Sequence, residues 1–226
     1  MQRGGRAFSR RRSDEETEGG RAMTIEPLVS EARERLIARA KREGLVSVGY
    51  DVMDSLLGPL WIAVGPRGVL AIHYGAKPDP RDLARISRTY GPAVLPDRRS
   101  CDRVLTELDQ YFAHRRRSFD LDVDLTPLTP FQRRVLAATA LVPYGELTTY
   151  RQVARRAGNE QASRAAGGAI GSNPIPIVIP CHRVVASDGS LGGYAGGLPA
   201  KRRLLALERG EGQVPEGGWP PAHLGR

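Results

Sequence analysis

Residues 173–184 of the chain read NPIPIVIPCHRV. The apolar run 175–179 contains Pro176 and is followed by Pro180. Because proline has no backbone N–H to donate, such a run does not fit the middle of a sheet. The sequence therefore predicts an edge strand or active-site strand that ends just before Cys181.

A thiol and an imidazole are adjacent at the end of this run, at Cys181 and His182. An ordinary thiol has a pKa of about 8.5 and needs a base or a positive charge nearby to act as a nucleophile near neutrality. His182 and Arg183 are the nearest candidates. Neighbouring side chains of a strand point to opposite faces, so the pair can communicate only if the chain turns after Pro180. A free cysteine is more often a small buried hydrophobe, and these residues alone leave both interpretations open.

Two short helices joined by a turn are predicted upstream of this run. Thr129 and Thr149 each stand three residues before a Gln, which is the capping-box pattern. The helix after Thr149 ends near Gly158, and a second helix, over 160–171, is built largely from Ala and Gly. This arrangement fits a helix-turn-helix, and the small side chains would allow a close approach to the narrow minor groove of DNA. Packing of the small face against a neighbouring helix is the alternative.

The first half of the chain has the pattern of a small α+β domain. An amphipathic helix is predicted over 25–42, a β-hairpin over 60–74 and a second amphipathic helix over 101–114. We therefore predict a small antiparallel sheet with helices, ending near Asp124. Cys101 lies on the second of these helices with no motif around it, and we interpret it as structural.

The net charge of the chain is +9 and is concentrated in its second half. Residues 127–210 carry eleven Arg and Lys against four Asp and Glu. This excess favours a polyanionic partner, although a solvated basic surface would give the same composition. The basic triplets 115–117 and 201–203 are interpreted as solvated, with phosphate contact as the alternative.

Composition also limits the class of protein. Two cysteines are too few for a disulfide framework, and no spacing of Cys or His indicates a metal site. No apolar run approaches the roughly 20 residues that cross a bilayer, and the Arg-rich start of the chain is unlike a signal peptide. We therefore expect a cytoplasmic protein, associated with the nucleoid if it is bacterial. Segment 1–22 is predicted to be a disordered tail, and 211–226 a flexible one.

Five separated motifs together resemble the O6-alkylguanine-DNA alkyltransferases, also called methylated-DNA-protein cysteine methyltransferases. They occur in order over about residues 127–210, and several separated matches in one order make the resemblance specific. The run 173–184 resembles the active-site signature of that family, and 192–197 resembles its substrate loop. The remaining motifs lie at 144–150 and 163–169, which resemble the family's helix-turn-helix, and at 204–208.

The resemblance implies a two-domain α+β fold. A ribonuclease H-like domain is expected over 23–126, and a mostly helical, winged helix-turn-helix-like domain for DNA binding and alkyl transfer over 127–210. The implied activity is direct-reversal DNA repair, an irreversible single-turnover transfer of an alkyl group from O6 of guanine to Cys181. O4 of thymine is a second candidate substrate atom. The implied partner is double-stranded DNA that carries O6-alkylguanine, bound through its minor groove. We expect a monomer that uses no cofactor and no metal.

The resemblance also implies roles for single residues. Cys181 matches the nucleophile of the family. His182 and Glu208 match a relay that acts through water to convert the thiol to a thiolate. Asn173 matches the residue that braces the turn around the nucleophile. Tyr150 matches the hydroxyl that protonates the leaving guanine, and general acid catalysis commonly gives roughly 10² to 10⁴ in rate.

Further matches concern the DNA and the base pocket. Arg164 matches the arginine that fills the stack vacated by a flipped nucleotide. Many family members have Ser where this chain has Ala195, so a backbone contact to the base survives but a side-chain hydrogen bond is lost. The other expected contacts are Pro176, Val184, Tyr194 and Gly196 at the pocket, and Ala165 and Gly167 at the DNA.

Two other functions fit parts of the pattern. A cysteine hydrolase could use the same Cys, His and Glu, but it leaves the helix-turn-helix unexplained. A noncatalytic lesion-binding protein of the alkyltransferase-like kind would share the fold and the DNA contacts. Such a protein carries a different residue at the cysteine position, so Cys181 argues against it.

Overall fold

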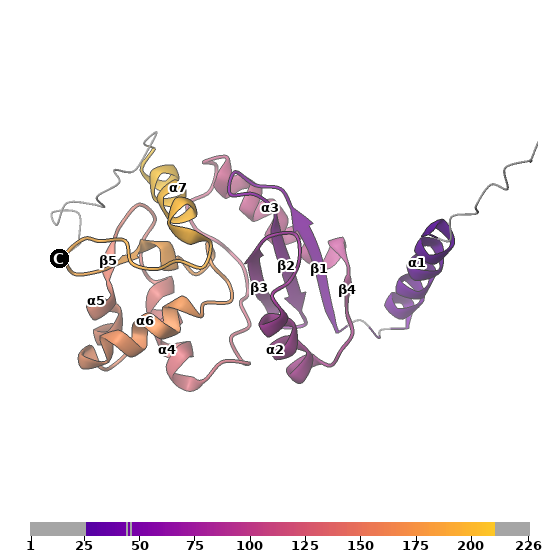
Figure 1. Cartoon of the computed structure of the whole chain (residues 1–226), viewed down its shortest axis with the longest axis horizontal. Helices are drawn as coiled ribbons and strands as arrows, with labels where there is room; N and C mark the ends of the chain where they lie inside the picture. Colours follow the sequence, from indigo (N-terminus) through magenta and orange to yellow (C-terminus); the bar gives the residue numbers. More distant parts are fainter. Residues whose placement is uncertain (1–25, 44, 46, 211–226) are drawn as a thin grey trace, which may run out of the picture.

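The computed structural model describes residues 26–43, 45 and 47–210 (Figure 1). A four-stranded sheet with its helices forms the first half of the molecule, and a mostly helical half follows it along the chain. The predicted tails 1–22 and 211–226 lie outside the described residues. Within the described ranges, no helix is both long and apolar enough to cross a membrane.

The sheet has the strand order β3-β2-β1-β4. Strands β1 (Val48–Met53), β2 (Leu60–Gly65) and β3 (Gly68–Tyr74) are antiparallel neighbours, and β2 and β3 form the predicted hairpin. Strand β4 (Val94–Pro96) pairs with β1 in parallel, so the prediction of an antiparallel sheet is wrong at this edge. Three residues are too few to show an alternating pattern, and a crossover connection lets the last strand run parallel.

Helix α2 (Pro80–Tyr90) lies in the connection between β3 and β4, and the sequence pattern above does not predict it. Its start carries a readable signal, because Asp79 accepts a hydrogen bond from the backbone of Arg81 and a proline occupies the first turn. Its apolar face is short, with Ile86 as the buried residue. Leu83, Ile86 and Tyr90 stand at helical spacing and pack into one cluster with the sheet, so the sequence carried a periodic signal for this helix as well.

Helix α3 (Arg98–Phe112) confirms the predicted helix over 101–114. It contacts β1 and β2, and it buries Cys101, Leu108 and Tyr111 completely. Helix α1 (Glu26–Arg42) is also present as predicted, but it stands away from the sheet in Figure 1. Leu36 on this helix is 67% exposed, so no described part of the chain covers this position of the predicted apolar stripe.

Four helices shape the described part of the C-terminal half. Helices α4 (Pro130–Ala140) and α5 (Tyr150–Arg156) both begin with the predicted capping boxes. Helix α6 (Ser163–Gly171) follows a single 3₁₀ turn, and it packs against α4 and α5. Helix α7 (Gly197–Arg209) ends this half at a left-handed glycine, Gly210.

The small residues of α6 serve two faces of the helix. Ala166 and Ala169 are buried in the cluster formed with α4 and α5. Arg164, Ala165 and Gly168 are exposed. Packing against neighbouring helices therefore explains one face, and the other face presents Arg164 beside the small residues Ala165 and Gly168.

The run 175–179 forms a tight turn instead of the predicted edge strand. The backbone N–H of Ile179 donates to the carbonyl of Ile175 at 2.9 Å, and Ile177 has a φ of 75°. Pro176 fixes its own φ and cannot donate to a ladder, which favours a turn over an extended pairing. Ile175 and Ile177 are fully buried, so the apolar character of the run reflects core packing.

This turn packs on the N-terminal sheet. The backbone N–H of Ile72 in β3 donates to the carbonyl of Pro174 at 2.8 Å. One hydrophobic cluster includes Ile72 and Leu108 from the first half and Ile175 and Leu204 from the second. The two halves thus share a core, and the sheet supports the turn that leads to Cys181.

Candidate active site

Cys181 opens a single 3₁₀ turn (Cys181–Arg183) at the end of this run. Asn173 makes two hydrogen bonds to the backbone of residues 175–179, which precede this turn. Its Nδ2 donates to the carbonyl of Ile179 at 2.9 Å, and its Oδ1 accepts from the backbone N–H of Ile175 at 3.0 Å. The turn that the thiol and the imidazole need in order to communicate is therefore present, and Cys181 is only 5% exposed.

Strand β5 (Thr148–Thr149) pairs in parallel with β6 (Val184–Val185). This pairing ties the start of α5, with Tyr150 as its first residue, to the residues that follow the Cys181 turn. The helix-turn-helix and the thiol are thereby held in one rigid unit.

His182 contacts Glu208 on α7. Its Nε2 lies 2.8 Å from Oε1 of the carboxylate, and both side chains are fully buried. Burial lowers the pKa of His182 and outweighs the opposing effect of Glu208, so the ring is neutral near pH 7. A neutral ring that donates from Nε2 carries its lone pair on Nδ1. That atom is buried and has no hydrogen-bond partner among the described residues.

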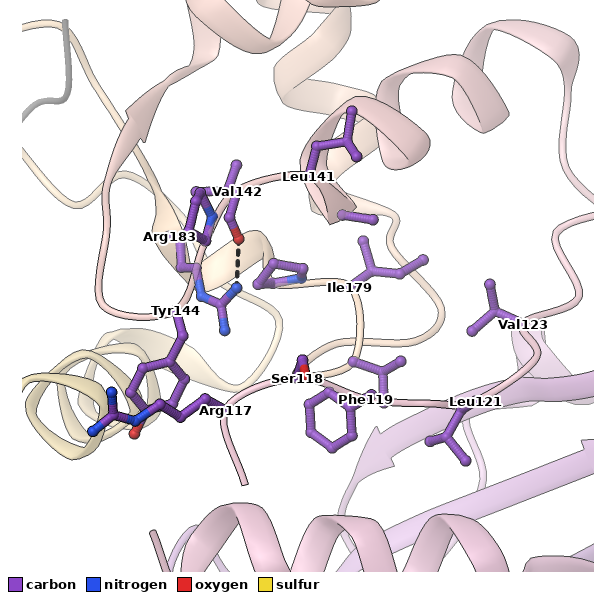
Figure 2. Close-up of a pocket in the computed structure, with 14 residues that line it drawn as sticks. Arg117, Ser118, Phe119, Leu121, Val123, Leu141, Val142, Tyr144, Ile179 and Arg183 are labelled. Atoms are coloured by element: carbon purple, nitrogen blue, oxygen red, sulfur yellow. Dashed lines mark hydrogen bonds between the residues drawn. The ribbon is translucent and has the colours of Figure 1, made fainter. Parts of the chain in front are cut away.

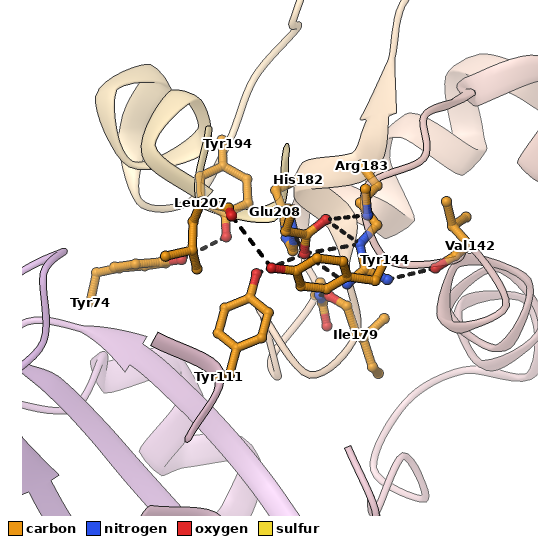
Figure 3. Close-up of polar contacts among 12 residues, drawn as sticks. Tyr74, Tyr111, Val142, Tyr144, Ile179, His182, Arg183, Tyr194, Leu207 and Glu208 are labelled. Carbon is orange, nitrogen blue, oxygen red and sulfur yellow. Dashed lines mark hydrogen bonds and ion pairs between the residues drawn. The ribbon is translucent and has the colours of Figure 1, made fainter. Parts of the chain in front are cut away.

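Three further groups hold the Glu208 carboxylate (Figure 3). Arg183 donates from Nε at 2.9 Å and from Nη2 at 2.7 Å. The hydroxyl of Tyr111 donates at 2.7 Å, and the backbone N–H of Gly145 donates at 3.0 Å. Burial by itself raises the pKa of Glu208, but the contacts with His182 and Arg183 outweigh it and lower the pKa. The carboxylate is therefore ionised and fixed in orientation.

Two of these partners differ from what the sequence suggested. Arg183 is a candidate activator of the thiol by adjacency, yet its guanidinium binds Glu208 and the carbonyl of Val142, the latter at 2.6 Å. Tyr111 comes from α3, where the helical pattern predicts only an apolar face. No local motif links Tyr111 to Glu208, because the contact joins residues that are far apart in the sequence.

Lys201 is fully buried beside the site, so the interpretation of 201–203 as a solvated triplet is wrong for this residue. Its Nζ donates to the carbonyls of Val184 and Leu191, the first at 2.6 Å. Burial lowers the pKa of Lys201 to about 8. Helical spacing offered a signal, because Lys201 stands three residues before the buried Leu204 on one helix face.

The electrostatics of Cys181 set a chemical requirement. Burial raises the pKa of the thiol, and the Asn173 amide and the charge of Lys201 oppose that rise only in part. The thiol is therefore protonated near pH 7 unless a base takes the proton. The neutral imidazole of His182 is the next residue.

Tyr150 lies between α6 and the glycine loop 192–197. A β-carbon added to Gly192 would meet the Tyr150 hydroxyl at 2.7 Å, and one added to Gly167 would lie 3.8 Å from the Tyr150 ring. The ring packs against the hydrophobic cluster that contains Cys181. Burial, and secondarily Cys181, raises the pKa of Tyr150, so its hydroxyl keeps its proton near pH 7.

The glycine loop 192–197 carries three of the predicted pocket residues. The ring of Tyr194 is nearly perpendicular to that of His182, with centroids 6.4 Å apart, and it packs against the Cys181 cluster. Ala195 is exposed, and Gly196 is half-buried.

The structure gathers one group of the predicted site residues around the thiol and places a second group elsewhere. Arg164 and Ala165 lie on the exposed face of α6, outside the buried cluster. Val184 is buried in the same hydrophobic cluster as Cys181, and Pro176 is buried in the turn before it. Near the thiol, Asn173 bonds to the turn before Cys181, and His182 bonds to Glu208. Tyr150 and Tyr194 pack against the hydrophobic cluster that contains Cys181.

A cavity of about 300 Å³ borders Arg183 and the turn before Cys181 (Figure 2). Its walls come from the segment 117–123, from residues 140–144 after α4, and from 178–180 together with Arg183. Cys181 is not among the lining residues. The cavity is therefore not the space in front of the thiol.

Comparison with known proteins agrees with this geometry. Residues 48–125 match the family described as 6-O-methylguanine DNA methyltransferase, ribonuclease-like domain. Residues 130–210 match the family described as 6-O-methylguanine DNA methyltransferase, DNA binding domain. The two matches together span most of the chain.

Individual relatives point the same way. A protein of Mycobacterium tuberculosis named methylated-DNA--protein-cysteine methyltransferase is 39% identical over 165 residues, which cover 72% of this chain and 93% of that protein. A protein of the same name from Methanosarcina acetivorans is 50% identical over 161 residues, covering 70% and 97%.

Solved structures confirm the α+β fold. The crystal structure of Mycobacterium tuberculosis O6-methylguanine methyltransferase has a TM-score of 0.62 and 37% identity, and the match covers 75% of this chain and 96% of that one. The structure of the Mycobacterium tuberculosis protein OGT in complex with DNA has a TM-score of 0.63 and 37% identity, covering 72% and 93%. Matched by both family domains and by close relatives over most of its length, the chain belongs to the 6-O-methylguanine DNA methyltransferase family.

Proposed function

We propose that this protein repairs DNA by moving an alkyl group from O6 of guanine to the sulfur of Cys181. The observation that carries the proposal is a buried cysteine on a braced turn, beside a neutral imidazole whose buried Nδ1 has no hydrogen-bond partner in the part of the chain that the structure describes. The names of the relatives, and a neighbour solved in complex with DNA, support the same substrate.

The reaction balances without a cofactor. The sulfur forms a bond to the alkyl carbon as the bond from that carbon to O6 breaks, and the electron pair leaves with guanine. The Cys181 proton passes through water to Nδ1 of His182, whose Nε2–H is held by Glu208. The product is a thioether, which ordinary cellular reductants do not reverse. Each molecule therefore reacts once.

Tyr150 supplies the proton that the departing guanine needs. Its hydroxyl keeps its proton near pH 7, and its ring lies against the Cys181 cluster. General acid catalysis of this kind commonly contributes roughly 10² to 10⁴ in rate. The carbonyls of Cys181 and Val184 and the amide of Ala195 read the edge of the base, and the carbonyl of Val184 is already held by Lys201.

The exposed face of α6 binds the minor groove. Ala165 on this face allows the helix to approach the DNA backbone closely, and Arg164 fills the stack after the target nucleotide flips out. Gly167 lies partly buried against the Tyr150 ring, where the absence of a side chain lets the helix sit close to the general acid. Residues 127–210 then form the domain for DNA binding and alkyl transfer, and 23–126 form the domain that supports it. We place the protein in the cytoplasm, associated with the nucleoid if it is bacterial, and we expect it to act as a monomer.

One experiment tests the proposal directly. The protein is incubated with duplex DNA that carries O6-methylguanine with a labelled methyl group, and the intact protein and its peptides are weighed by mass spectrometry. We expect one methyl group per molecule, on Cys181, and no further uptake when more DNA is added. A second duplex with O4-methylthymine defines the substrate range.

Two variants sharpen the result. Cys181→Ser should take up no label. Cys101→Ser is the matched control and should label fully, because Cys101 is completely buried against the sheet and its pKa is raised by burial to about 12. Repeated turnover would indicate a hydrolase, and binding without label would indicate a lesion-binding protein. Either outcome would overturn the proposal.

A further inference from the structure

Two tyrosines from different halves of the molecule hold the glycine loop 192–197. Tyr150, from α5, meets the loop at Gly192, where an added β-carbon would lie 2.7 Å from its hydroxyl. Tyr74, the last residue of β3, meets it at Gly196, where an added β-carbon would lie 2.8 Å from its ring. At both places a tyrosine side chain fills the space that a β-carbon on the glycine would need.

Tyr74 also contacts the loop through its hydroxyl (Figure 3). The hydroxyl oxygens of Tyr74 and Tyr194 are 2.6 Å apart, and the two rings meet at 65° with centroids 5.8 Å apart. Burial raises the pKa of both groups, so both hydroxyls keep their protons. One loop therefore receives two contacts from a single side chain of the sheet.

Backbone hydrogen bonds on either side of Tyr74 fix its position at the end of β3. Its neighbours in the chain bond to other backbone segments, Ile72 to Pro174 at 2.8 Å and Gly75 to Pro59 at 2.8 Å. A side chain on a paired strand is placed more accurately than one on a free loop. Tyr74 can therefore fix the loop relative to the turn that leads to Cys181, because both rest on the same strand.

We propose that Tyr74 is a positioning residue for alkyl transfer, which sets the place of loop 192–197 over Cys181 through Tyr194 and Gly196. This inference rests on the proposed function, in which the loop contacts the guanine. With Ala195 in the loop, the base is read by a backbone amide, and a backbone contact depends on where the backbone lies. A sheet residue of the N-terminal half thereby takes part in a reaction performed by the C-terminal half.

Tyr74→Phe tests the inference, because it removes the hydroxyl and leaves the ring against Gly196. The substrate is O6-benzylguanine as a free base, which needs the loop but no DNA contact. We expect the rate constant for benzyl transfer to Cys181 to fall about fivefold, the factor that one net hydrogen bond represents. Tyr50→Phe is the matched control, since Tyr50 lies on the same sheet and packs on Trp61 instead of the loop. It should react like the parent.

A second reaction separates positioning from general damage. Alkylation of Cys181 by iodoacetamide needs the thiol but not the loop, so Tyr74→Phe should leave its rate unchanged. Tyr194→Phe, together with the variant that carries both Tyr74→Phe and Tyr194→Phe, completes a double-mutant cycle. If the two hydroxyls act on each other, the double variant should lose no more benzyl transfer than either single variant.

The outcomes are distinct. Benzyl transfer at the parental rate in Tyr74→Phe, a parallel loss in the iodoacetamide reaction, or losses that multiply in the double variant would each overturn the positioning role. Absence of any methyl group on Cys181 of the parent after incubation with O6-methylguanine duplex DNA would overturn the proposed function itself. A labelled parent with an unchanged Tyr74→Phe variant would overturn this inference alone.

Discussion

Nε2 of His182 lies 2.8 Å from Oε1 of Glu208, and neither side chain reaches solvent. The same carboxylate binds the guanidinium of Arg183 and accepts a hydrogen bond from the hydroxyl of Tyr111. When a buried polar group loses its hydrogen-bond partner, no water replaces that partner, so the full free-energy cost of the unsatisfied group destabilises the fold. This carboxylate therefore holds the fold together at the same place where it orients the imidazole.

Replacing Glu208 by Gln should reveal how much the carboxylate contributes to the stability of the fold and how much to the reaction. The amide keeps the shape but leaves Arg183 buried without its counter-charge, so we expect a loss of about 3–5 kcal/mol in the free energy of unfolding. Benzyl transfer should slow by about 10²-fold, the low end of general base catalysis. Urea denaturation and the rate on O6-benzylguanine measure the two effects. Glu146→Gln is the control, because Glu146 is exposed in the same half. A folded Glu208→Gln variant that reacts at the parental rate would remove the carboxylate from the mechanism.

The stability of the protein should fall as the medium becomes acidic, through His182. Its pKa is lower in the folded protein than in the unfolded chain, mainly because of burial. The unfolded chain therefore takes up a proton below about pH 6.5 that the folded protein refuses, and stability is lost as the pH falls, at up to about 1.4 kcal/mol per pH unit. Urea midpoints at several values between about pH 7 and pH 5 measure this slope.

His182→Gln is the comparison for that slope. Its amide can still donate to Glu208, but it does not titrate, so its stability should change less over the same pH window. Equal slopes in the parent and the variant would mean that another group causes the acid sensitivity.

Local signals predicted much of the fold. The capping boxes at Thr129 and Thr149 involve residues three apart, and the hairpin of β2 and β3 needs only its own turn. The parallel edge strand and the turn at 175–179 depend on distant partners. The turn, for example, is fixed to the sheet by the backbone N–H of Ile72, which donates to the carbonyl of Pro174.

The residues of the site also fall into those that a local motif predicts and those that depend on distant partners. Motif residues such as Cys181 and His182 stand out because they are adjacent in the sequence. The roles of Tyr111 and Tyr74 were not predicted, because they arise only when the sheet, the loop and α7 meet. Lys201 was interpreted as solvated although its helical spacing indicated burial, and its two carbonyl partners could not be read from the sequence. A residue whose partner lies on another element leaves no local pattern, so the supporting contacts of the site were the least predictable part.

Removing the buried ammonium of Lys201 should affect both stability and the thiol. Lys201→Met leaves the carbonyls of Val184 and Leu191 without this donor, which should lower the free energy of unfolding by about 1–3 kcal/mol. Because Lys201 is one of the groups that lower the pKa of Cys181, that pKa should rise. The pH dependence of iodoacetamide alkylation should therefore move to higher pH.

Lys77→Met is the matched control for that experiment, since Lys77 is exposed in the N-terminal half. It should shift neither the unfolding midpoint nor the alkylation profile. An unmoved profile in Lys201→Met would show that the ammonium has no influence on the thiol.

Arg164 offers the sharpest test of base flipping, because it is exposed on α6 and lies outside the buried cluster around Cys181. Extruding a base costs a few kcal/mol, and a side chain that fills the gap offsets part of that cost. Arg164→Ala should therefore lower the limiting rate on saturating duplex DNA by about tenfold or more, and leave the reaction with free O6-benzylguanine unchanged. A phosphate contact alone would weaken binding and its salt dependence but spare the limiting rate. Arg88→Ala, on the exposed surface of α2, should change neither rate. Equal losses on duplex and free base would place Arg164 in the support of the fold, and the vacated stack would then need another occupant.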